Sequence, residues 1–460
     1  MSSPQSLTFT EDELRPRSTA RFTRTFAIVV AVLVVACGVF AALGYLQGPK
    51  LQSTRVDLPS LVSKPGQQLG LFANQPLATV SADHVTVTPS TPISVSTKGD
   101  VVSIQFDQML DYATDYTVRV DGVTGATSSQ GSSMEYSFTT PMPDVYLLER
   151  GDTTDSVVRV SVGGNKRDVV YSGERIQDFT IVGTALAVLA ITPDGLSDLK
   201  LVDLGDGVVQ QIMLPSPGVI TQLDASTVGA ALGFVFTPQS GGADELLAVN
   251  YDVGVTIAPV LGLSGEPLDV TTWQFVPGGT QLVVHSTDSG LFLADLASAS
   301  IVPLRQFAEV GRVSRDGASL TVKDAMGTSM LSLPGGEVTP LVASPLGDAH
   351  PFVGAIEVLP NGTSLAKIAF QTTDGKFRTA LALDDGTEMR VVYENDGASL
   401  ENFTVSPNGQ LVAVEVVPDF AGAVSDGYER QPSYSTTVTH FIDIASGRIL
   451  ATRPGLAPHW

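Results

Sequence analysis

The distribution of apolar residues divides the chain into one continuous apolar stretch and a much longer region of short alternating segments. From Phe26 to Leu46 the sequence FAIVVAVLVVACGVFAALGYL contains no charged residue. A helix of this length, at about 1.5 Å per residue, covers roughly 30 Å, the thickness of the hydrocarbon core of a bilayer. The pattern therefore predicts one transmembrane helix over residues 25–46, which would attach the chain to a membrane.

Basic residues indicate the orientation of this helix. Four arginines lie within the 24 residues before it: Arg15, Arg17, Arg21 and Arg24. Only Lys50 and Arg55 follow within the next ten residues. Because positive charge favours the cytoplasmic side, we expect a single-pass protein of the cell membrane with residues 1–24 as a cytoplasmic tail. Everything after the helix is then extracytoplasmic.

The chain has one cysteine, Cys37, and it lies inside the apolar stretch. Val34-Val-Ala-Cys37 also resembles a bacterial lipobox, in which the cysteine is lipidated and becomes the new N-terminus. The residues after Cys37 remain apolar, whereas a lipoprotein has a polar tether there, so an uncleaved anchor is favoured over a lipoprotein. Both interpretations attach an ectodomain that has no disulfide.

After a short segment rich in proline, residues 47–66, which we interpret as a stalk, the apolar period changes to two. Residues 84–88, 93–96, 104–106 and 116–120 each alternate apolar and polar side chains, and turn residues such as Pro89 and Gly122 separate them. Alternation of this kind predicts half-buried strands. About seven short strands in about 75 residues indicate a β-sandwich over residues 67–141.

Several phrases in this region resemble a known family. They are Asn74-Gln-Pro-Leu77, Val85-Thr-Val87, Asp115-Tyr-Thr-Val-Arg-Val120 and Tyr136-Ser-Phe-Thr-Thr140. Together they resemble the bacterial Ig-like domain first described in surface-layer proteins (SbsA-type). The resemblance implies a spacer or adhesion module without catalytic residues.

The remainder of the chain contains an internal repeat. Four turn sequences align, and they end at Gly279, Gly317, Gly362 and Gly409, which are separated by 38, 45 and 47 residues. Three residues after each glycine stands an apolar residue: Leu282, Leu320, Leu365 or Val412. This spacing is typical of the four-stranded blades of a β-propeller.

Weaker copies of the repeat begin near Ile176 and Val219, and Val145 to Tyr171 supplies three strands without a first one. The apolar C-terminus, Gly455 to Trp460, stops where the first strand of a blade would begin. We expect it to pair into the first blade and close a ring over residues 143–460, with about seven blades and with six or eight as alternatives. The four turns are Val276-Pro-Gly-Gly279, Ser314-Arg-Asp-Gly317, Leu359-Pro-Asn-Gly362 and Ser406-Pro-Asn-Gly409. These turns, of the type Ser-Pro-x-Gly, resemble those of the PD40 or WD40-like blades of TolB-type propellers. The expected fold is an all-β ectodomain, an Ig-like β-sandwich plus a propeller, preceded by one transmembrane helix.

Charge restricts the partners of this ectodomain. The formal net charge is −22, and the first 24 residues contribute +1, so the rest of the chain carries −23. A surface of this charge repels phosphate backbones and has few cations to replace their counterions, so no nucleic-acid partner is expected.

No arrangement of residues indicates catalysis. The histidines are scattered, and the metalloprotease, phosphate-loop and nucleophile-elbow motifs are absent from the sequence. Asp203, Asp206 and Gly207 lack the ligand order of a calcium loop and are better explained as a hairpin turn. We therefore expect no enzyme activity, no cofactor and no metal.

One segment is longer than a blade requires. Residues 418–435 lie between two predicted strands of the last blade, the second and the third, and long loops in compact repeats often have a function. The loop contains Asp426, Tyr428, Glu429, Arg430 and Tyr434. These five residues are the candidate partner-binding loop; the alternative is a flexible surface loop. Trp273, on a predicted innermost strand, is expected in the core rather than in the channel.

These observations favour a non-catalytic, membrane-anchored extracytoplasmic binding or scaffold protein of the bacterial cell envelope. Its expected partner is a protein or a wall glycan on the propeller face. The alternative is an accessory or sensor subunit of an envelope complex, whose helix or tail makes the contact. A hydrolase acting on wall polymers or peptides is a third, less favoured class.

Overall fold

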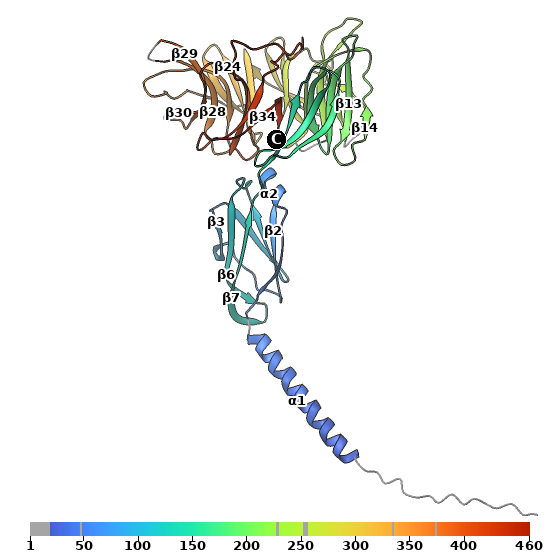
Figure 1. Ribbon diagram of the computed structural model, residues 1–460, viewed down its shortest axis with the longest axis vertical. Coiled ribbons are helices and arrows are strands. Elements are labelled where there is room, and N and C mark those ends of the chain that lie inside the picture. Colours follow the sequence, from blue (N-terminus) through green and yellow to red (C-terminus); the bar gives the residue numbers. More distant parts are fainter. Residues whose placement is uncertain (1–18, 47, 227–229, 252–255, 334, 373–374) are drawn as a thin grey trace, which may run out of the picture. The chain divides into compact units, whose positions relative to one another are not determined.

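A computed structural model describes residues 19–460 except 47, 227–229, 252–255, 334 and 373–374. The N-terminal helix α1 spans Thr19–Leu46, and none of its residues from Phe22 to Val39 is buried by the rest of the chain (Figure 1). An apolar helix with no protein around it needs another apolar environment, and a single-pass membrane anchor or a signal sequence meets that need. Most of the predicted cytoplasmic tail lies outside the described residues.

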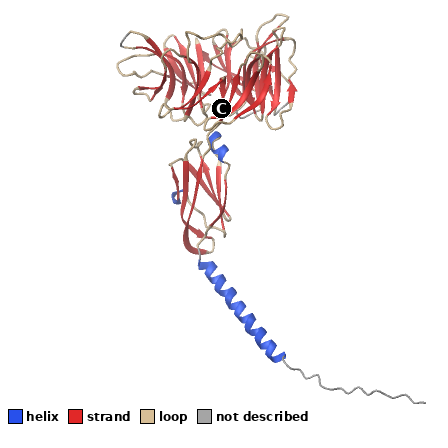
Figure 2. Cartoon of the chain, in the orientation of Figure 1, coloured by secondary structure: helices blue, strands red, loops and turns tan. Residues whose placement is uncertain are grey.

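The rest of the described chain forms two compact units, both built of strands (Figure 2). The first contains residues up to Asp57 together with Gly66–Gln108 and Asp115–Phe138. The second contains Thr139–Trp460 and two short segments, Leu58–Pro65 and Met109–Thr114. The units are therefore not continuous in sequence, whereas we had expected a boundary near residue 142.

The first unit has two sheets that face each other. One has the order β1-β2-β5-β4 and the other β3-β6-β7. Their bounds are β1 (Leu51–Arg55), β2 (Gln68–Ala73), β3 (Val85–Thr88), β4 (Ile93–Lys98), β5 (Val101–Phe106), β6 (Asp115–Gly125) and β7 (Ser128–Thr139), with a 3₁₀ helix η1 (Ala82–His84) before β3. Phe106 of one sheet lies edge-on to Phe138 of the other, with ring centroids 6.3 Å apart. Contacts of this kind between inner faces define a sandwich core.

Part of the predicted stalk is wrong. Residues 51–55 form β1, which pairs with β2, and Leu58–Ser63 form a short helix, α2. The pairing of β1 is interrupted by a bulge between Leu51 and Ser53. The bulge breaks the alternation of side chains, which explains why a period-two pattern is not visible in LQSTR.

Seven four-stranded sheets, counted over the described residues, form the propeller of the second unit. Numbered from the inside outward, the first four blades are as follows. Blade 1 contains β35 (Leu456–His459), β8 (Asp144–Glu149), β9 (Asp155–Ser161) and β10 (Arg167–Gly173). Blade 2 contains β11 (Ile176–Val182), β12 (Ala185–Ile191), β13 (Ser197–Asp203) and β14 (Val209–Gln211). Blade 3 contains β15 (Gly218–Ala225), β16 (Ala231–Pro238), β17 (Glu245–Asn250) and β18 (Ala258–Pro259). Blade 4 contains β19 (Val270–Phe275), β20 (Gln281–Ser286), β21 (Gly290–Asp295) and β22 (Ser300–Gln306).

The last three blades follow the same order. Blade 5 contains β23 (Glu309–Val313), β24 (Ser319–Asp324), β25 (Gly327–Ser332) and β26 (Val338–Pro340). Blade 6 contains β27 (Phe352–Val358), β28 (Ser364–Gln371), β29 (Phe377–Asp384) and β30 (Met389–Glu394). Blade 7 contains β31 (Ser399–Val405), β32 (Leu411–Val417), β33 (Val438–Asp443) and β34 (Ile449–Pro454). The predicted all-β fold with about seven blades is confirmed.

The ring closes through its C-terminus, as the apolar end of the sequence predicted. Strand β35 pairs with β8, with Leu456 opposite Leu148 and His459 opposite Tyr146. Beyond it, Trp460 donates from Nε1 to the carbonyl oxygen of Thr404 in blade 7 (3.3 Å). The C-terminal residues therefore join the first and last blades and cover the edge that β8 would otherwise expose.

The propeller has two distinct faces. Because neighbouring strands of a blade are antiparallel, the turns after the first and third strands lie on one face, which we call the turn-side face. The loops after the second strands and the connections between blades lie on the opposite, loop-side face. Segment Met109–Thr114 is fixed to the turn-side face, because Asn408 Nδ2 donates to the carbonyl oxygen of Leu110 (3.0 Å).

Every innermost strand of the propeller is bulged where it pairs with the second strand of its blade. In blade 2 the shift falls between Ile176 and Asp178, and in blade 3 between Thr221 and Asp224. A bulge leaves a residue without ladder partners and redirects its side chain. At each bulge, backbone N–H and C=O groups in the wall of the central channel therefore need hydrogen-bond partners from outside their own sheet.

Candidate functional site

The predicted partner-binding loop forms a strap that crosses the loop-side face. We use this name for residues 418–437, which connect β32 to β33. The two arms of the strap meet in a short antiparallel ladder, in which Ser425 bridges Tyr434. Gly427 has φ 77°, and this conformation, which favours glycine, turns the chain after Asp426. From blade 7 the strap reaches residues of blades 1 and 2, so it spans the seam where the ring closes.

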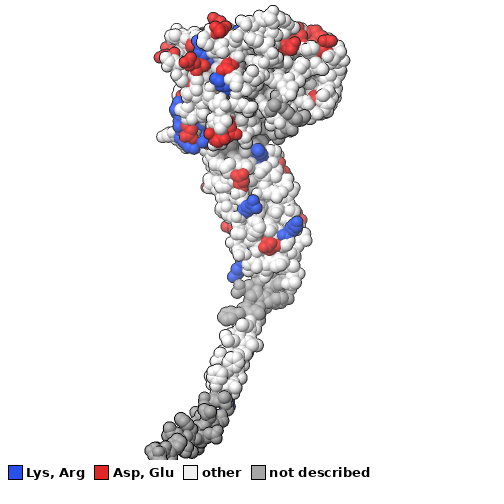
Figure 3. All heavy atoms as spheres, turned by 90° about the vertical axis from the view of Figure 1, so that its right-hand side faces the viewer, with Lys and Arg blue, Asp and Glu red and all other residues white. Residues whose placement is uncertain are grey.

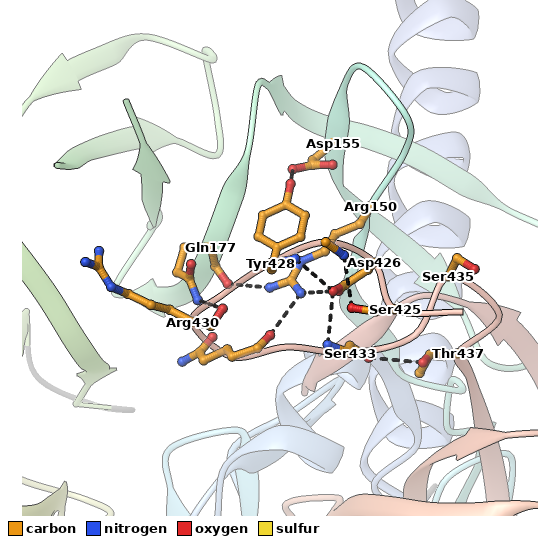
Figure 4. A network of polar contacts seen from close by, with 12 residues as sticks. Arg150, Asp155, Gln177, Ser425, Asp426, Tyr428, Arg430, Ser433, Ser435 and Thr437 are labelled. Carbon is orange, nitrogen blue, oxygen red and sulfur yellow. Dashed lines mark hydrogen bonds and ion pairs between the residues drawn. The ribbon is translucent and has the colours of Figure 1, made fainter. Parts of the chain in front are cut away.

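Asp426 is the buried centre of the strap (Figure 4). Its Oδ2 lies 2.5 Å from Nη1 of Arg150, which follows β8, and both side chains are 4% exposed. Oδ1 of Asp426 accepts hydrogen bonds from the backbone N–H groups of Tyr428 and Ser433 (3.2 Å each). Arg150 also donates to the carbonyl oxygens of Gln431 (3.0 Å) and Gln177 (2.8 Å). One ion pair therefore ties the strap to blades 1 and 2.

Tyr428 packs into the same cluster. The Arg150 guanidinium lies 3.9 Å from its ring centroid, and that of Arg175 lies 4.8 Å from it. The Tyr428 hydroxyl donates to Oδ2 of Asp155, a buried residue at the start of β9. Burial and the neighbouring carboxylate raise the pKa of Tyr428 well above its usual range, so the hydroxyl remains a donor.

The other three candidates lie at the surface of the strap. The carbonyl oxygen of Arg430 accepts from Nε2 of Gln177, while its guanidinium reaches the carbonyl of Gly195 in blade 2 (3.4 Å). Tyr434 is partly buried and lies edge-on to Phe420, with centroids 5.6 Å apart. Glu429 is exposed. Of the five candidates, Asp426 and Tyr428 are thus internal contacts, Arg430 and Tyr434 are partly buried in contacts of the strap, and Glu429 is exposed.

Sequence reasoning missed the residues that hold the strap. Arg150, Asp155 and Gln177 lie more than 240 residues before it, and nothing local to them in the sequence marks them as its partners. Of the three, only Arg150 stands out in the sequence, because it is a basic residue directly after the apolar strand β8. Long-range pairs of this kind follow from closing the ring, which brings blades 1 and 7 together.

In the wall of the channel, backbone carbonyl groups of the bulged inner strands accept hydrogen bonds from side chains of neighbouring segments. The Thr271 carbonyl accepts from Nε2 of Gln222 (3.0 Å), and the Gly311 carbonyl accepts from Nε2 of Gln274 (2.6 Å). The Leu400 carbonyl accepts from Nζ of Lys367 (2.5 Å). These hydrogen bonds join neighbouring segments of the wall, and that of Leu400, a buried residue, also satisfies a backbone carbonyl away from solvent.

Three charged residues connect blades 5 and 6. Glu357, 2% exposed in its side chain, accepts from Arg312 through Oε2 (2.9 Å) and from Arg315 through Oε1 (2.7 Å). Arg312 continues to Oδ1 of Asn402 (2.7 Å), and Arg315 to Oγ1 of Thr404 (2.7 Å), both in blade 7. A carboxylate between two guanidiniums that are themselves bound is a structural junction of three blades.

Two carboxyl groups of the inner strands have perturbed pKa values. Burial raises the pKa of Asp178 to about 6 and that of Asp224 to about 6, and repulsion from Asp224 adds to the shift of Asp178. Asp178 accepts from Phe179 N (2.8 Å) and from Gln431 Nε2 (2.9 Å), whereas Asp224 accepts from Ala225 N (2.8 Å) and Phe275 N (3.1 Å). Values near neutrality suit acid–base chemistry. All four oxygens, however, already accept hydrogen bonds from the chain, which favours a structural role.

The possible metal ligands and Trp273, noted from the sequence, have structural surroundings. No group of three or more His, Cys, Asp or Glu side chains that could hold a metal occurs in the described part of the chain. Oδ1 of Asp203 accepts from the N–H groups of Gly205 (2.7 Å) and Asp206 (3.1 Å), which is a hairpin turn. Trp273 is buried and lies 5.5 Å from Phe275, ring to ring, in the core as predicted.

The loop-side face also exposes large apolar side chains that the sequence did not single out. Six of them lie on blades 5 to 7 and form what we call the blade 5–7 patch: Met326, Val342, Phe352, Phe377, Phe420 and Val424. Met326 and Phe377 lie at connections between the second and third strands of blades 5 and 6, and Phe352 begins the first strand of blade 6. Phe420 and Val424 belong to the strap.

Comparisons with known proteins give the fold alone. No protein-family model matches the chain, and no curated protein matches it. Among solved structures it is similar to the β-propeller domain of the Trilobed protease from Pyrococcus furiosus, at 12% identity over 64% of this chain and 95% of that chain (TM-score 0.42). It is also similar to TolB from Acinetobacter baumannii, at 11% identity over 82% of each chain (TM-score 0.37). Oligogalacturonate lyase in complex with manganese matches at 10% identity over 83% of this chain and 98% of that chain (TM-score 0.44).

These neighbours include a lyase and a domain of a protease, and at such TM-scores they carry no argument about activity. The propeller assignment rests on the strand pairing described above. The resemblance of residues 67–141 to a bacterial Ig-like domain stays a prediction.

Proposed function

We propose that this chain is a non-catalytic binding or scaffold protein of the bacterial cell envelope, held by its N-terminal helix and extracytoplasmic from residue 47 onward. The observation that carries the proposal is the blade 5–7 patch. Exposed large apolar side chains that gather on neighbouring loops of one face often mark interaction sites, whereas single ones need no explanation. The patch lies on the face opposite the one to which segment Met109–Thr114 is fixed.

The charged groups of the ring support a non-catalytic role. Asp178 and Asp224, whose pKa values burial raises, and the buried Glu357 are each occupied by hydrogen bonds or ion pairs within the wall. Glu415, whose pKa burial also raises, accepts a hydrogen bond from Ala457 N through Oε1 (3.1 Å). A catalytic group must instead reach a substrate atom within hydrogen-bonding distance. The same groups explain how a ring without disulfides stays rigid enough to present a fixed surface.

Retention on envelope fractions tests the proposal. The full-length chain, reconstituted in nanodiscs of neutral lipid, is passed over sacculi, purified wall glycans and solubilised membrane proteins, with empty nanodiscs as the control. We expect saturable retention of one of these fractions. Retention of none of them, by a protein whose circular dichroism shows a folded propeller, contradicts a binding role.

Substitution of the two inner carboxyl groups distinguishes a binding protein from an enzyme. Asp178→Asn and Asp224→Asn should leave retention unchanged, because both residues lie in the wall. Loss of a measured hydrolytic activity on wall polymers with either variant would instead establish catalysis.

A further inference from the structure

The blade 5–7 patch is asymmetric on the ring. Its members are strongly exposed: Met326 by 94%, Phe352 by 72% and Phe377 by 65%. The loop-side connections of blades 1, 2 and 4 contribute one exposed large apolar side chain among the described residues, Met213, and blade 3 contributes Leu261 and Leu263. Exposed apolar side chains that gather on consecutive blades form a directional surface rather than a scatter.

The same sector is acidic. Exposed carboxylates lie on the same loops as the apolar side chains: Asp324, Asp348, Asp419 and Glu429. Asp396 is exposed on the neighbouring connection between β30 and β31, where Gly397 accepts a hydrogen bond from Phe420 N. The basic groups nearby are largely neutralised, since Lys323 pairs with Glu309 (3.1 Å) and Arg378 pairs with both Glu394 (2.6 Å) and Asp396 (2.8 Å). Lys376, which precedes Phe377, and Arg430 of the strap are two further cations, and His350 is exposed. Residues 139–460 contain 37 Asp and Glu against 17 Lys and Arg, a net charge of −20. Figure 3, which faces the side of the propeller that carries β13 and β14, shows that acidic side chains also lie along the upper rim there.

From this combination we infer that the blade 5–7 patch docks a cationic amphipathic protein segment, one that presents Lys or Arg beside large apolar side chains. The inference rests on the proposed binding function and specifies its partner. Burial of Phe352, Phe377 and Phe420 supplies affinity, because aromatic residues dominate interface energetics. The surrounding carboxylates attract and orient a basic partner.

The negative charge around the patch disfavours three other partners: an anionic membrane, a nucleic acid and a second copy of this chain. An anionic membrane surface and a nucleic acid are both repelled by the carboxylates around the patch. A second copy of this chain would bring one net charge of −20 against another, which opposes association at low salt.

A pair of synthetic peptides tests the inference on the full-length chain in nanodiscs of neutral lipid. One is an amphipathic helix-forming peptide of leucine and lysine, and the other has glutamate at every lysine position. We expect saturable binding of the Leu–Lys peptide by fluorescence anisotropy, weakening as salt is raised, and no binding of the Leu–Glu peptide. Light scattering on the same sample reports self-association.

Matched substitutions locate the site. The variant Phe352→Ser/Phe377→Ser should bind the Leu–Lys peptide about tenfold or more weakly, the effect of losing one or two anchoring side chains. The control is Val208→Ser/Val209→Ser, which removes two exposed apolar side chains from the turn after β13, on the turn-side face. It should bind as the wild type does. Because all four side chains are exposed, unfolding temperatures should differ little among the three proteins.

Three outcomes overturn the inference: equal binding of both peptides, binding that is unaffected by Phe352→Ser/Phe377→Ser, or dimers detected at low salt that bury the patch. Failure of the proposed function looks different. If an envelope fraction retains the wild type and the Phe352→Ser/Phe377→Ser variant equally, the protein is a binder that uses another surface. If no fraction retains the wild type, the binding role itself fails.

Discussion

The carboxylate of Asp426 and the guanidinium of Arg150 lie 2.5 Å apart, each side chain 4% exposed, although they are 276 residues apart in the chain. This pair is the point at which the strap of blade 7 is fixed to blade 1. The closure of the ring therefore has two parts, the strand β35 in the sheet of blade 1 and the strap across the loop-side face. The two parts suggest that the loop conformation and the stability of the ring are coupled.

Asp426→Asn should lower the free energy of unfolding by about 3 kcal/mol, because removing one charge of a buried pair leaves the other uncompensated. Chemical denaturation of the detergent-solubilised chain measures the change. Arg150→Met combined with Asp426→Asn should cost less than the sum of the single variants. Arg378→Ala provides the control, since its pairs with Glu394 and Asp396 are far more exposed than the pair of Arg150 and Asp426, and pairs near the surface are worth less than about 1 kcal/mol. Equal effects of Asp426→Asn and Arg378→Ala would count against the strap as a fixing element.

Tyr428→Phe tests the hydroxyl alone. The ring and its contacts with Arg150 and Arg175 remain, while the hydrogen bond to Asp155 is lost. We expect a loss of about 1 to 2 kcal/mol in the free energy of unfolding, since the acceptor is a buried carboxylate. Tyr393→Phe is the matched control, because the Tyr393 hydroxyl has only a 3.5 Å contact with Asn395. An unchanged stability of Tyr428→Phe would contradict the geometry of the cluster.

The pH dependence of stability should reveal the inner carboxyl groups. Because the pKa of Asp178 is raised to about 6 in the folded state from 3.8, the folded state binds a proton that the unfolded state does not bind between these values. The contribution of Asp178 to stability therefore rises as pH falls from above 6 to below 3.8. Asp178→Asn, which mimics the protonated form, should be more stable than wild type at neutral pH, by on the order of 2 kcal/mol.

That gain should disappear near pH 4, in denaturation curves recorded across this range. Asp288→Asn should change the free energy of unfolding at neutral pH in the opposite direction. Hydrogen bonds from Ser286 and Gly290 lower the pKa of Asp288, so its charged form stabilises the fold and its removal costs stability at neutral pH. If Asp178→Asn destabilises the protein at neutral pH, the carboxylate is needed in its charged form.

Membrane attachment should not depend on Cys37. Helix α1 provides the apolar length needed to span a bilayer, so Cys37→Ser should stay in the membrane fraction after carbonate extraction. Intact mass of the wild type should correspond to the full chain without a lipid. A lipid-modified N-terminus at Cys37, together with release of Cys37→Ser, would establish the lipoprotein alternative.

The strands and the closure of the ring could be predicted because their signals are local. Alternating side chains in residues 116–120 and the turns at Gly279, Gly317, Gly362 and Gly409 each depend on a few neighbouring residues. The apolar C-terminus could be assigned to the first blade because its three other strands were visible in the sequence. Strand β1 was missed because a bulge disrupts its alternation.

The orientation of the strap could not be predicted. Asp426 and Tyr428 have the composition of an interface, and a polar, aromatic loop gives no local sign of whether it faces solvent or the protein. Their burial depends on Arg150, Asp155 and Gln177, which only the closed ring brings within reach. The exposure of Phe377 was hidden because it begins a strand whose later apolar residues, Ala380 to Ala382, are buried. Phe352 begins a strand in which the other apolar residues are only partly buried or exposed, and its alternation gave no local sign of this.

The central claim is that the loop-side face, and not the turn-side face, contacts a basic partner. Photocrosslinking in the native cell tests it most directly, with benzoylphenylalanine in place of Phe377 in one variant and Val208 in another. We predict adducts from position 377 and none from 208, with crosslinked peptides that carry net positive charge by mass spectrometry. Equal adducts from both positions, or acidic crosslinked peptides, would contradict the account.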